Sequence, residues 1–117
     1  MISIRGAITT ENNRETMLDD TENLLKEILV ANDLEQEDII QITFTATKDL
    51  DAVYPAVAAR TLGIKQASLL CMQEMYVEGS LAKCIRVMVL AESDIKQRDV
   101  KHIYLKEAQS LRKDLVK

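Results

Sequence analysis

Three arginines lie in segments whose other residues are apolar or small, and these side chains are the best suited to chemistry. Arg5 stands between an isoleucine and a glycine, and Arg60 follows two alanines. Arg86 interrupts the apolar run CIRVMVL at 84–90. A guanidinium keeps its charge in a protein, so a buried arginine needs an anionic partner. We expect each of these arginines to face a carboxylate of the chain or an anionic ligand.

Arg86 is the most informative of the three because every neighbour in its predicted strand is typical of a protein core. Glu74, in another apolar segment, is the carboxylate that we expect beside it. A small dicarboxylate is the other candidate, since arginine grips carboxylates through two parallel hydrogen bonds. The residues alone support an internal salt bridge and such a ligand about equally.

Other residues of reactive type have simpler interpretations. Tyr104 is expected in the core with its hydroxyl at the edge, and Met72 is expected to fill core space. Cys71 is expected to be a small buried residue, because no histidine lies near it in the sequence to activate it. The sequence has no Ser–His–Asp pattern, no glycine-rich phosphate loop and no metal-ligand spacing. The residues by themselves therefore indicate an anion-binding domain.

Composition limits the class of protein. The 117 residues have the length of one domain, spanning 1–117. A hydrophobic content of 47% suffices for a core, which must be aliphatic because only 3% of residues are aromatic. A formal net charge of −4 disfavours nucleic-acid binding. No apolar run approaches the roughly twenty residues that span a bilayer.

Cysteine and histidine usage restricts the cofactors and the compartment. Cys71 and Cys84 do not form a CxxC pair, and the single histidine, His102, cannot supply a metal cluster. Arg5 stands where a signal peptide would be apolar. We therefore predict a cytoplasmic protein with reduced thiols, no metal or other cofactor, and no nucleic-acid or membrane partner.

The spacing of apolar residues predicts the elements that must position these side chains. Leu18, Thr21, Leu25 and Ile28 recur at intervals of three and four, which is typical of an amphipathic helix. Alternating, β-branched or apolar runs predict strands. The predicted helices are 14–32 and 55–63, with a further turn or two at 106–111. The predicted strands are 1–7, 38–47, 67–75 and 83–92, with 100–105 as a further candidate, and 67–75 and 83–92 are expected to be central.

Four or five strands with one long and one short helix predict a mixed α/β domain whose helices cover one face of the sheet. The chain has too few helices to cover the other face as well. Since an aliphatic sheet face needs a cover, we expect this face to pack against other copies of the chain.

Six strings of the sequence resemble the monofunctional AroH-type chorismate mutases. They are IRGA (4–7), AVYPAVAAR (52–60), CMQEM (71–75), KCIRVM (83–88), HIYL (102–105) and LRKDL (111–115). The resemblance runs from about residue 2 to 115, and CMQEM followed by KCIRV is its most specific part. It implies a single mixed β-sheet domain of the α/β (α+β) class with one long and one short helix, which trimerises into a pseudo-α/β-barrel.

The resemblance also implies roles for named residues in converting chorismate to prephenate. Arg86 would donate to the ether oxygen of the breaking bond, and Glu74 would accept from the ring hydroxyl. Arg5 and Tyr104 would bind carboxylates of chorismate. Two of the further residues implied in substrate binding, Tyr54 and Arg60, would come from a neighbouring subunit. The full further set is Tyr54, Arg60, Leu70, Cys71, Met72, Gln73 and, from the C-terminal tail, Arg112.

Two other functions fit a similar architecture. Small trimeric enamine/imine deaminases also bind a carboxylate with an arginine between subunits, but CMQEM with KCIRV argues against that class. A non-catalytic protein that binds a metabolite would need only carboxylate clamps. The presence of Arg86 together with Glu74 favours catalysis over simple binding.

Overall fold

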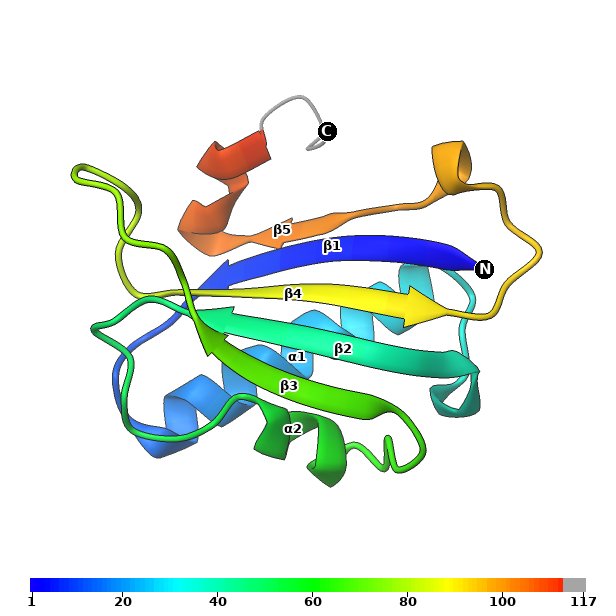
Figure 1. Cartoon of the computed structure of the whole chain (residues 1–117), viewed down its shortest axis with the longest axis horizontal. Helices are drawn as coiled ribbons and strands as arrows, with labels where there is room; N and C mark the ends of the chain where they lie inside the picture. Colours follow the sequence, from blue (N-terminus) through cyan, green and yellow to red (C-terminus); the bar gives the residue numbers. More distant parts are fainter. Residues whose placement is uncertain (113–117) are drawn as a thin grey trace.

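One mixed five-stranded β-sheet organises the computed structural model, which describes residues 1–112 (Figure 1). The strand order is β3-β2-β4-β1-β5, with β4 antiparallel to both of its neighbours and the two outer pairs parallel. This confirms the predicted fold class. The elements in chain order are β1 (Ile2–Thr9), α1 (Arg14–Ala31), η1 (Gln36–Asp38), β2 (Ile39–Ala46), α2 (Ala56–Thr61), β3 (Ser68–Gln73), β4 (Cys84–Ala91), η2 (Gln97–Asp99), β5 (Ile103–Leu105) and η3 (Lys106–Arg112).

The long helix α1 covers most of one sheet face. The Asn13 side chain caps its start by accepting from the backbone N–H of Thr16 at 2.9 Å. The buried stripe of the helix comprises Met17, Thr21, Leu24, Leu25 and Ile28. The predicted stripe is therefore confirmed, except that Met17 is buried more deeply than Leu18. In the residues that the structure describes, no helix is long and apolar enough to cross a membrane.

The short helix α2 lies beside α1 behind the β3 edge of the sheet (Figure 1). Pro55 is its N-cap, and Ala56, Ala58 and Ala59 are buried. The helix ends before Gly63, which has a φ of +86° that other residues adopt only under strain. The proline and glycine signals in the sequence thus mark its true limits to within two residues.

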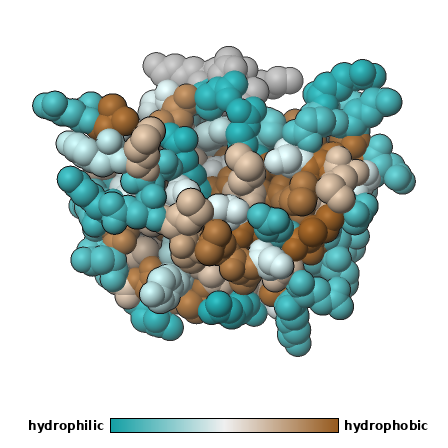
Figure 2. Space-filling model, in the orientation of Figure 1, coloured by the Kyte–Doolittle hydropathy of each residue, from teal (hydrophilic) through white to brown (hydrophobic). Residues whose placement is uncertain are grey.

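The two faces of the sheet differ in their cover. Along β4, Ile85, Val87 and Val89 point into the core beneath α1. The alternate residues belong to what we call the open face, formed by Arg86 and Met88 on β4, Thr43 and Thr45 on β2, Leu70 and Met72 on β3, and Arg5 and Ala7 on β1. Figure 2 views this face and shows apolar residues gathered over the strands.

The helical segment η3 covers one end of the open face. Ala108 packs on Ala7 and Cys84 in a second, small apolar cluster, against which Tyr104 and Leu111 also pack. The remainder stays exposed within residues 1–112, as the exposed fractions of Leu70 (55%), Met72 (51%) and Met88 (52%) show. The expectation that Met72 fills core space was therefore wrong, because this residue lies on the open face.

Two expectations about the apolar strands were wrong. The segment 67–75 forms the edge strand β3 and not a central one. The neighbours of Arg86 are not all buried either, because Met88 projects to the open face and the Arg86 side chain is itself 50% exposed. Both errors have one cause. An apolar sequence indicates that a residue is buried in the functional protein, but not whether it is buried by its own chain or by another one.

Gly6 allows α1 to approach β1 closely. A Cβ at this position would lie 2.8 Å from Ile28 Cδ1, 3.2 Å from Leu24 Cδ1 and 3.1 Å from Val87 Cγ2. A side chain here must therefore displace the helix or the packed ends of its residues.

Gly6→Val should lower the free energy of unfolding by about 1–3 kcal/mol, the usual cost of overpacking a core. Gly6→Ala should cost less, because the ends of flexible side chains can yield to one methyl group. Urea unfolding followed by circular dichroism measures both variants. Equal stability of Gly6→Val and the wild-type chain would contradict the close approach of α1 to β1.

Candidate active site

An ion pair on the open face joins two of the predicted site residues. Arg86 Nε lies 3.3 Å from Glu74 Oε1, and the Thr45 hydroxyl donates to the same oxygen at 2.8 Å. The Glu74 side chain is 27% exposed. The expected partnership of Arg86 with a carboxylate is therefore confirmed, although the pair lies in a half-exposed position and not inside the core.

Three strands build this group together. Glu74 directly follows β3, and its backbone N–H donates to the Ala46 carbonyl at 2.9 Å, which continues the pairing with β2. Thr45 lies opposite Arg86 in the ladder between β2 and β4. Because β2 separates β3 from β4, the Glu74 side chain reaches Arg86 across the short threonine and meets its hydroxyl on the way.

A second group of polar residues lies on the other side of β4. Ala7 of β1 is opposite both Arg86 and Tyr104, so this small residue separates the two longer side chains. Arg5 is opposite Met88, which makes it a diagonal neighbour of Arg86 on the same face. Diagonal residues of paired strands are about 7–8 Å apart, within the reach of long side chains.

Positive charge concentrates around His102. Its Nδ1 accepts from the backbone N–H of Arg5 at 2.9 Å. The pKa of His102 is lowered from 6.5 first by burial and then by the charges of Arg5 and Arg112. Arg5 has no ion pair within residues 1–112. This end of the open face is thus suited to hold an anion.

Cys84 begins β4 on the same face of the sheet, and its thiol has low reactivity. Its burial under η3 raises the pKa of the thiol to about 11, an effect that the charge of Arg86 only partly offsets. The thiol is therefore protonated at neutral pH and is a poor nucleophile.

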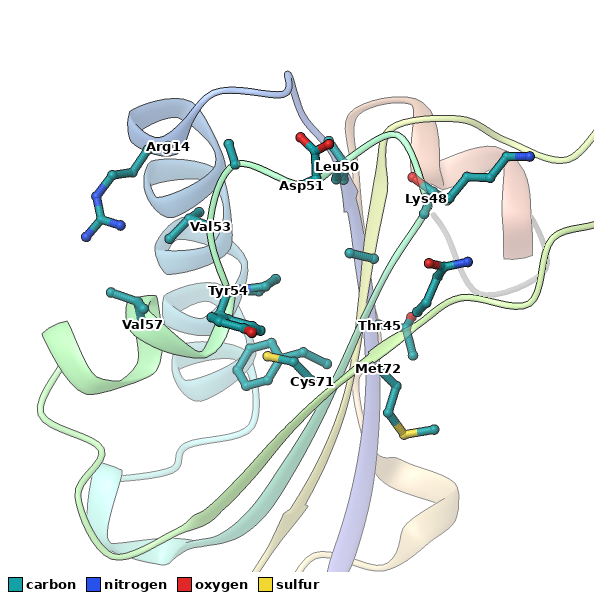
Figure 3. Close-up of a pocket in the computed structure, with 16 residues that line it drawn as sticks. Arg14, Thr45, Lys48, Leu50, Asp51, Val53, Tyr54, Val57, Cys71 and Met72 are labelled. Carbon is teal, nitrogen blue, oxygen red and sulfur yellow. The ribbon is translucent and has the colours of Figure 1, made fainter.

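The remaining predicted residues lie around the β3 edge. A cavity of ≈ 550 Å³ there is lined by the loop before α2 and by Tyr54, Cys71, Met72 and Gln73. Figure 3 shows Cys71 and Tyr54 pointing into this hollow, whereas Met72 projects away on the other side of the strand. Tyr54 is 73% exposed.

Arg60 is also exposed and lines a separate hollow beside α2, with Lys65 and Leu69. One chain therefore brings Arg5, Glu74, Arg86 and Tyr104 to its open face, and the charge of Arg112 acts on His102. It places Tyr54, Arg60 and the Cys71 thiol on the helix-covered side of the β3 edge. Leu70 and Met72 belong to the open face but stand at its rim, and Gln73 ends β3.

Two residues at the site had no role in the sequence-based prediction. Thr45 could have been found, because the alternation in TFTAT places Thr43, Thr45 and Thr47 on one face of the strand. His102 was considered only as a metal ligand, and nothing local in the sequence shows that its ring accepts from Arg5, 97 positions away.

The chemistry available on the open face is hydrogen bonding and charge. Two arginines, a carboxylate and a tyrosine can surround a small anion and orient it. In the part of the chain that the structure describes, no group of three or more His, Cys, Asp or Glu side chains could hold a metal ion. The arrangement therefore suits a reaction that depends on orientation and on stabilising negative charge.

Comparisons with known proteins agree on one family. Residues 1–115 match the family described as chorismate mutase type I. The chain is 45% identical to chorismate mutase AroH of Bacillus subtilis, over 96% of this chain and 90% of that protein. It is 43% identical to chorismate mutase AroH of Thermus thermophilus, over 96% and 93%. A solved chorismate mutase from Clostridium thermocellum superposes with a TM-score of 0.90 at 49% identity, covering 92% of this chain and 97% of that one.

His102 offers a direct test of the cationic cluster, since it is the single histidine of the sequence and gives isolated NMR signals. We predict an imidazole pKa below 6.5 in the folded protein. Arg5→Ala should raise this pKa, because it removes a nearby positive charge. Arg98→Ala, which changes an exposed arginine of η2, should leave it unchanged. A titration midpoint at or above 6.5 would contradict the cluster.

The same shift fixes the sign of a stability effect. Because the pKa of His102 is lowered in the folded state, the unfolded chain binds the proton more readily below pH 6.5. The contribution of His102 is therefore fully present above pH 6.5 and is lost as the pH falls through the folded-state pKa. His102→Asn should weaken this part of the pH dependence of urea unfolding.

Proposed function

Because this chain belongs to the chorismate mutase type I family, we infer that it rearranges chorismate to prephenate, and we propose that Arg86 and Glu74 carry the reaction. Family membership favours this reaction over the deaminase-like alternative. The observation that supports the proposed roles is the ion pair on the open face, in which Arg86 Nε lies 3.3 Å from a Glu74 oxygen that also accepts from the Thr45 hydroxyl.

The reaction explains why the site needs no nucleophile, general base or cofactor. The rearrangement is intramolecular: one C–O bond breaks while one C–C bond forms within the same molecule. The enzyme must hold the side chain of chorismate over its ring, which is catalysis by orientation. It must also stabilise the negative charge that grows on the ether oxygen, which is a task for a fixed cationic donor.

Arg86 is the donor that we assign to the ether oxygen. Its Nε is engaged by Glu74, so the carboxylate fixes the plane of the guanidinium before substrate arrives. The other N–H donors of the fork remain for the ether oxygen and a neighbouring carboxylate. A group already in position costs no reorganisation when the charge develops.

The other open-face residues orient the substrate in this proposal. Glu74 accepts from the ring hydroxyl, and Arg5 and Tyr104 bind the carboxylates of chorismate. Arg112 adds a positive charge next to His102, near Arg5. These roles follow from the family resemblance, and the shared face of Arg5, Glu74, Arg86 and Tyr104 supports them.

We propose that the working unit is a homotrimer with its sites between subunits. Two features support this assembly: the exposed apolar residues of the open face, and the location of Tyr54 and Arg60 on the opposite side of the β3 edge. A cleft that uses both sets must take the open face from one subunit and the edge from the next. Such head-to-tail contacts form a closed ring when the rotation between neighbours closes, as a three-fold rotation does. The two free thiols, Cys71 and Cys84, support a reducing compartment such as the cytoplasm.

Arg86→Ala should lower kcat by at least ~10²-fold, the effect expected from the loss of one preorganised donor to a transition-state charge. Arg86→Lys should restore little, because an ammonium cannot reproduce the planar fork. The rate is followed by the loss of chorismate absorbance, with Arg98→Ala as the control for loss of one exposed positive charge. If Arg86→Ala retains wild-type kcat, the electrostatic mechanism is wrong.

Subunit mixing tests whether the sites are shared. Arg86→Ala damages the open face and Arg60→Ala damages the edge, so each variant alone should have only defective clefts. When the two are unfolded together and refolded at equal concentrations, about one quarter of the clefts should combine two intact halves. Activity of the mixture should exceed the mean of the two variants refolded separately. Activity equal to that mean would show that each site lies within one subunit.

A further inference from the structure

We propose that Thr45 is a positioning residue for the rearrangement, which holds one oxygen of Glu74 so that the other oxygen meets the ring hydroxyl of chorismate. This inference rests on the role proposed above for Glu74. It adds a residue of β2 that acts through Glu74 and has no assigned contact with the substrate.

The contacts of the Glu74 carboxylate are unequal. Oε1 accepts the Thr45 hydroxyl at 2.8 Å and lies 3.3 Å from Arg86 Nε. Within residues 1–112, no hydrogen bond to Oε2 is present. A hydroxyl of β2 and the guanidinium of β4 thus both lie against Oε1, and Oε2 keeps its capacity to accept a hydrogen bond from a ligand.

Two contact points fix the orientation of a carboxylate better than one. If Arg86 were the only partner, the carboxylate could rotate and present both oxygens to the guanidinium in a bidentate pair. That pair would occupy N–H donors that Arg86 needs for the ether oxygen. By holding Oε1, Thr45 keeps only one oxygen of Glu74 against Arg86. Glu74 Oε2 then remains available for the ring hydroxyl, and the other N–H donors of Arg86 remain available for the ether oxygen.

The strand backbone fixes the position of the Thr45 hydroxyl beside Glu74. Thr45 is opposite Arg86 on one side and Met72 on the other, so its hydroxyl stands in the row that joins β3 to β4. A β-branched residue has few side-chain rotamers, which keeps the hydroxyl in one place.

Thr43 provides a matched control on the same strand and the same face. It is opposite Met88 and Leu70, one step along the open face from the ion pair. Its side chain makes no hydrogen bond in the described part of the chain. Thr43→Val therefore repeats the chemical change of Thr45→Val without touching Glu74.

The experiment measures kcat and KM for chorismate in Thr45→Val, Thr45→Ser and Thr43→Val. Thr45→Val removes the hydroxyl but keeps the shape, and it should lower kcat/KM roughly tenfold, about the effect of one hydrogen bond to a charged group. The loss should fall mainly on kcat, because both Glu74 and Arg86 lose their orientation. Thr45→Ser should restore at least half of the wild-type kcat/KM, and Thr43→Val should match the wild-type chain.

A double-mutant cycle separates positioning from a general structural effect. In the Glu74→Ala background, Thr45→Val should cause no further loss, since the group that it positions is absent. An equal loss in both backgrounds would overturn the inference, as would wild-type activity of Thr45→Val while Glu74→Ala is impaired. Wild-type activity of Glu74→Ala itself would instead overturn the proposed role of Glu74, and the role of Thr45 with it.

Discussion

The two-residue alternation of β4 is the constraint on which the rest of the structure depends. It commits Ile85, Val87 and Val89 to the core and, by the same geometry, Arg86 and Met88 to the open face. A shift of one residue would exchange the two sets and place a guanidinium beneath α1. The apolar contacts that fix the register of this strand therefore also place Arg86, the residue to which we assign the transition-state charge. Core packing and the proposed catalytic role thus depend on the same strand, although they use opposite faces of it.

Charge distribution, more than net charge, explains how an acidic chain accepts a dianionic substrate. The formal net charge is −4, yet Arg5 and Arg112 both act on His102 at one end of the open face. The Glu74 carboxylate on this face is held by Arg86 and Thr45. The internal salt bridge and the anionic ligand, which the sequence presented as alternatives, are thus compatible. The salt bridge orients the same arginine that the ligand would meet.

Local signals predicted the local structure well. The apolar spacing of α1, the Pro55 start of α2 and the positive φ of Gly63 all correspond to features readable from neighbouring residues. Three features were beyond such reading. The edge position of β3, the exposure of Arg86 and the Thr45–Glu74 contact depend on strand order and on which face lacks a cover. Strand order is set by contacts between distant parts of the chain, so the spacing of apolar residues within one segment does not predict it. The family resemblance supplied proposed site residues that periodicity could not.

The strand order also has a consequence for the biosynthesis of the protein. β1 precedes both of its neighbours in the sheet by many residues, because these neighbours are β4 and β5, at residues 84–91 and 103–105. While the intervening chain is translated, which takes seconds at about 5–20 residues per second, β1 has neither of its native partners. The helix α1 can form early from local contacts, and it can shelter the apolar side of β1 during that interval. Completion of the sheet must therefore await synthesis of residues 84–105, and the segment that carries Arg5 is made long before it can pair with its neighbours in the sheet.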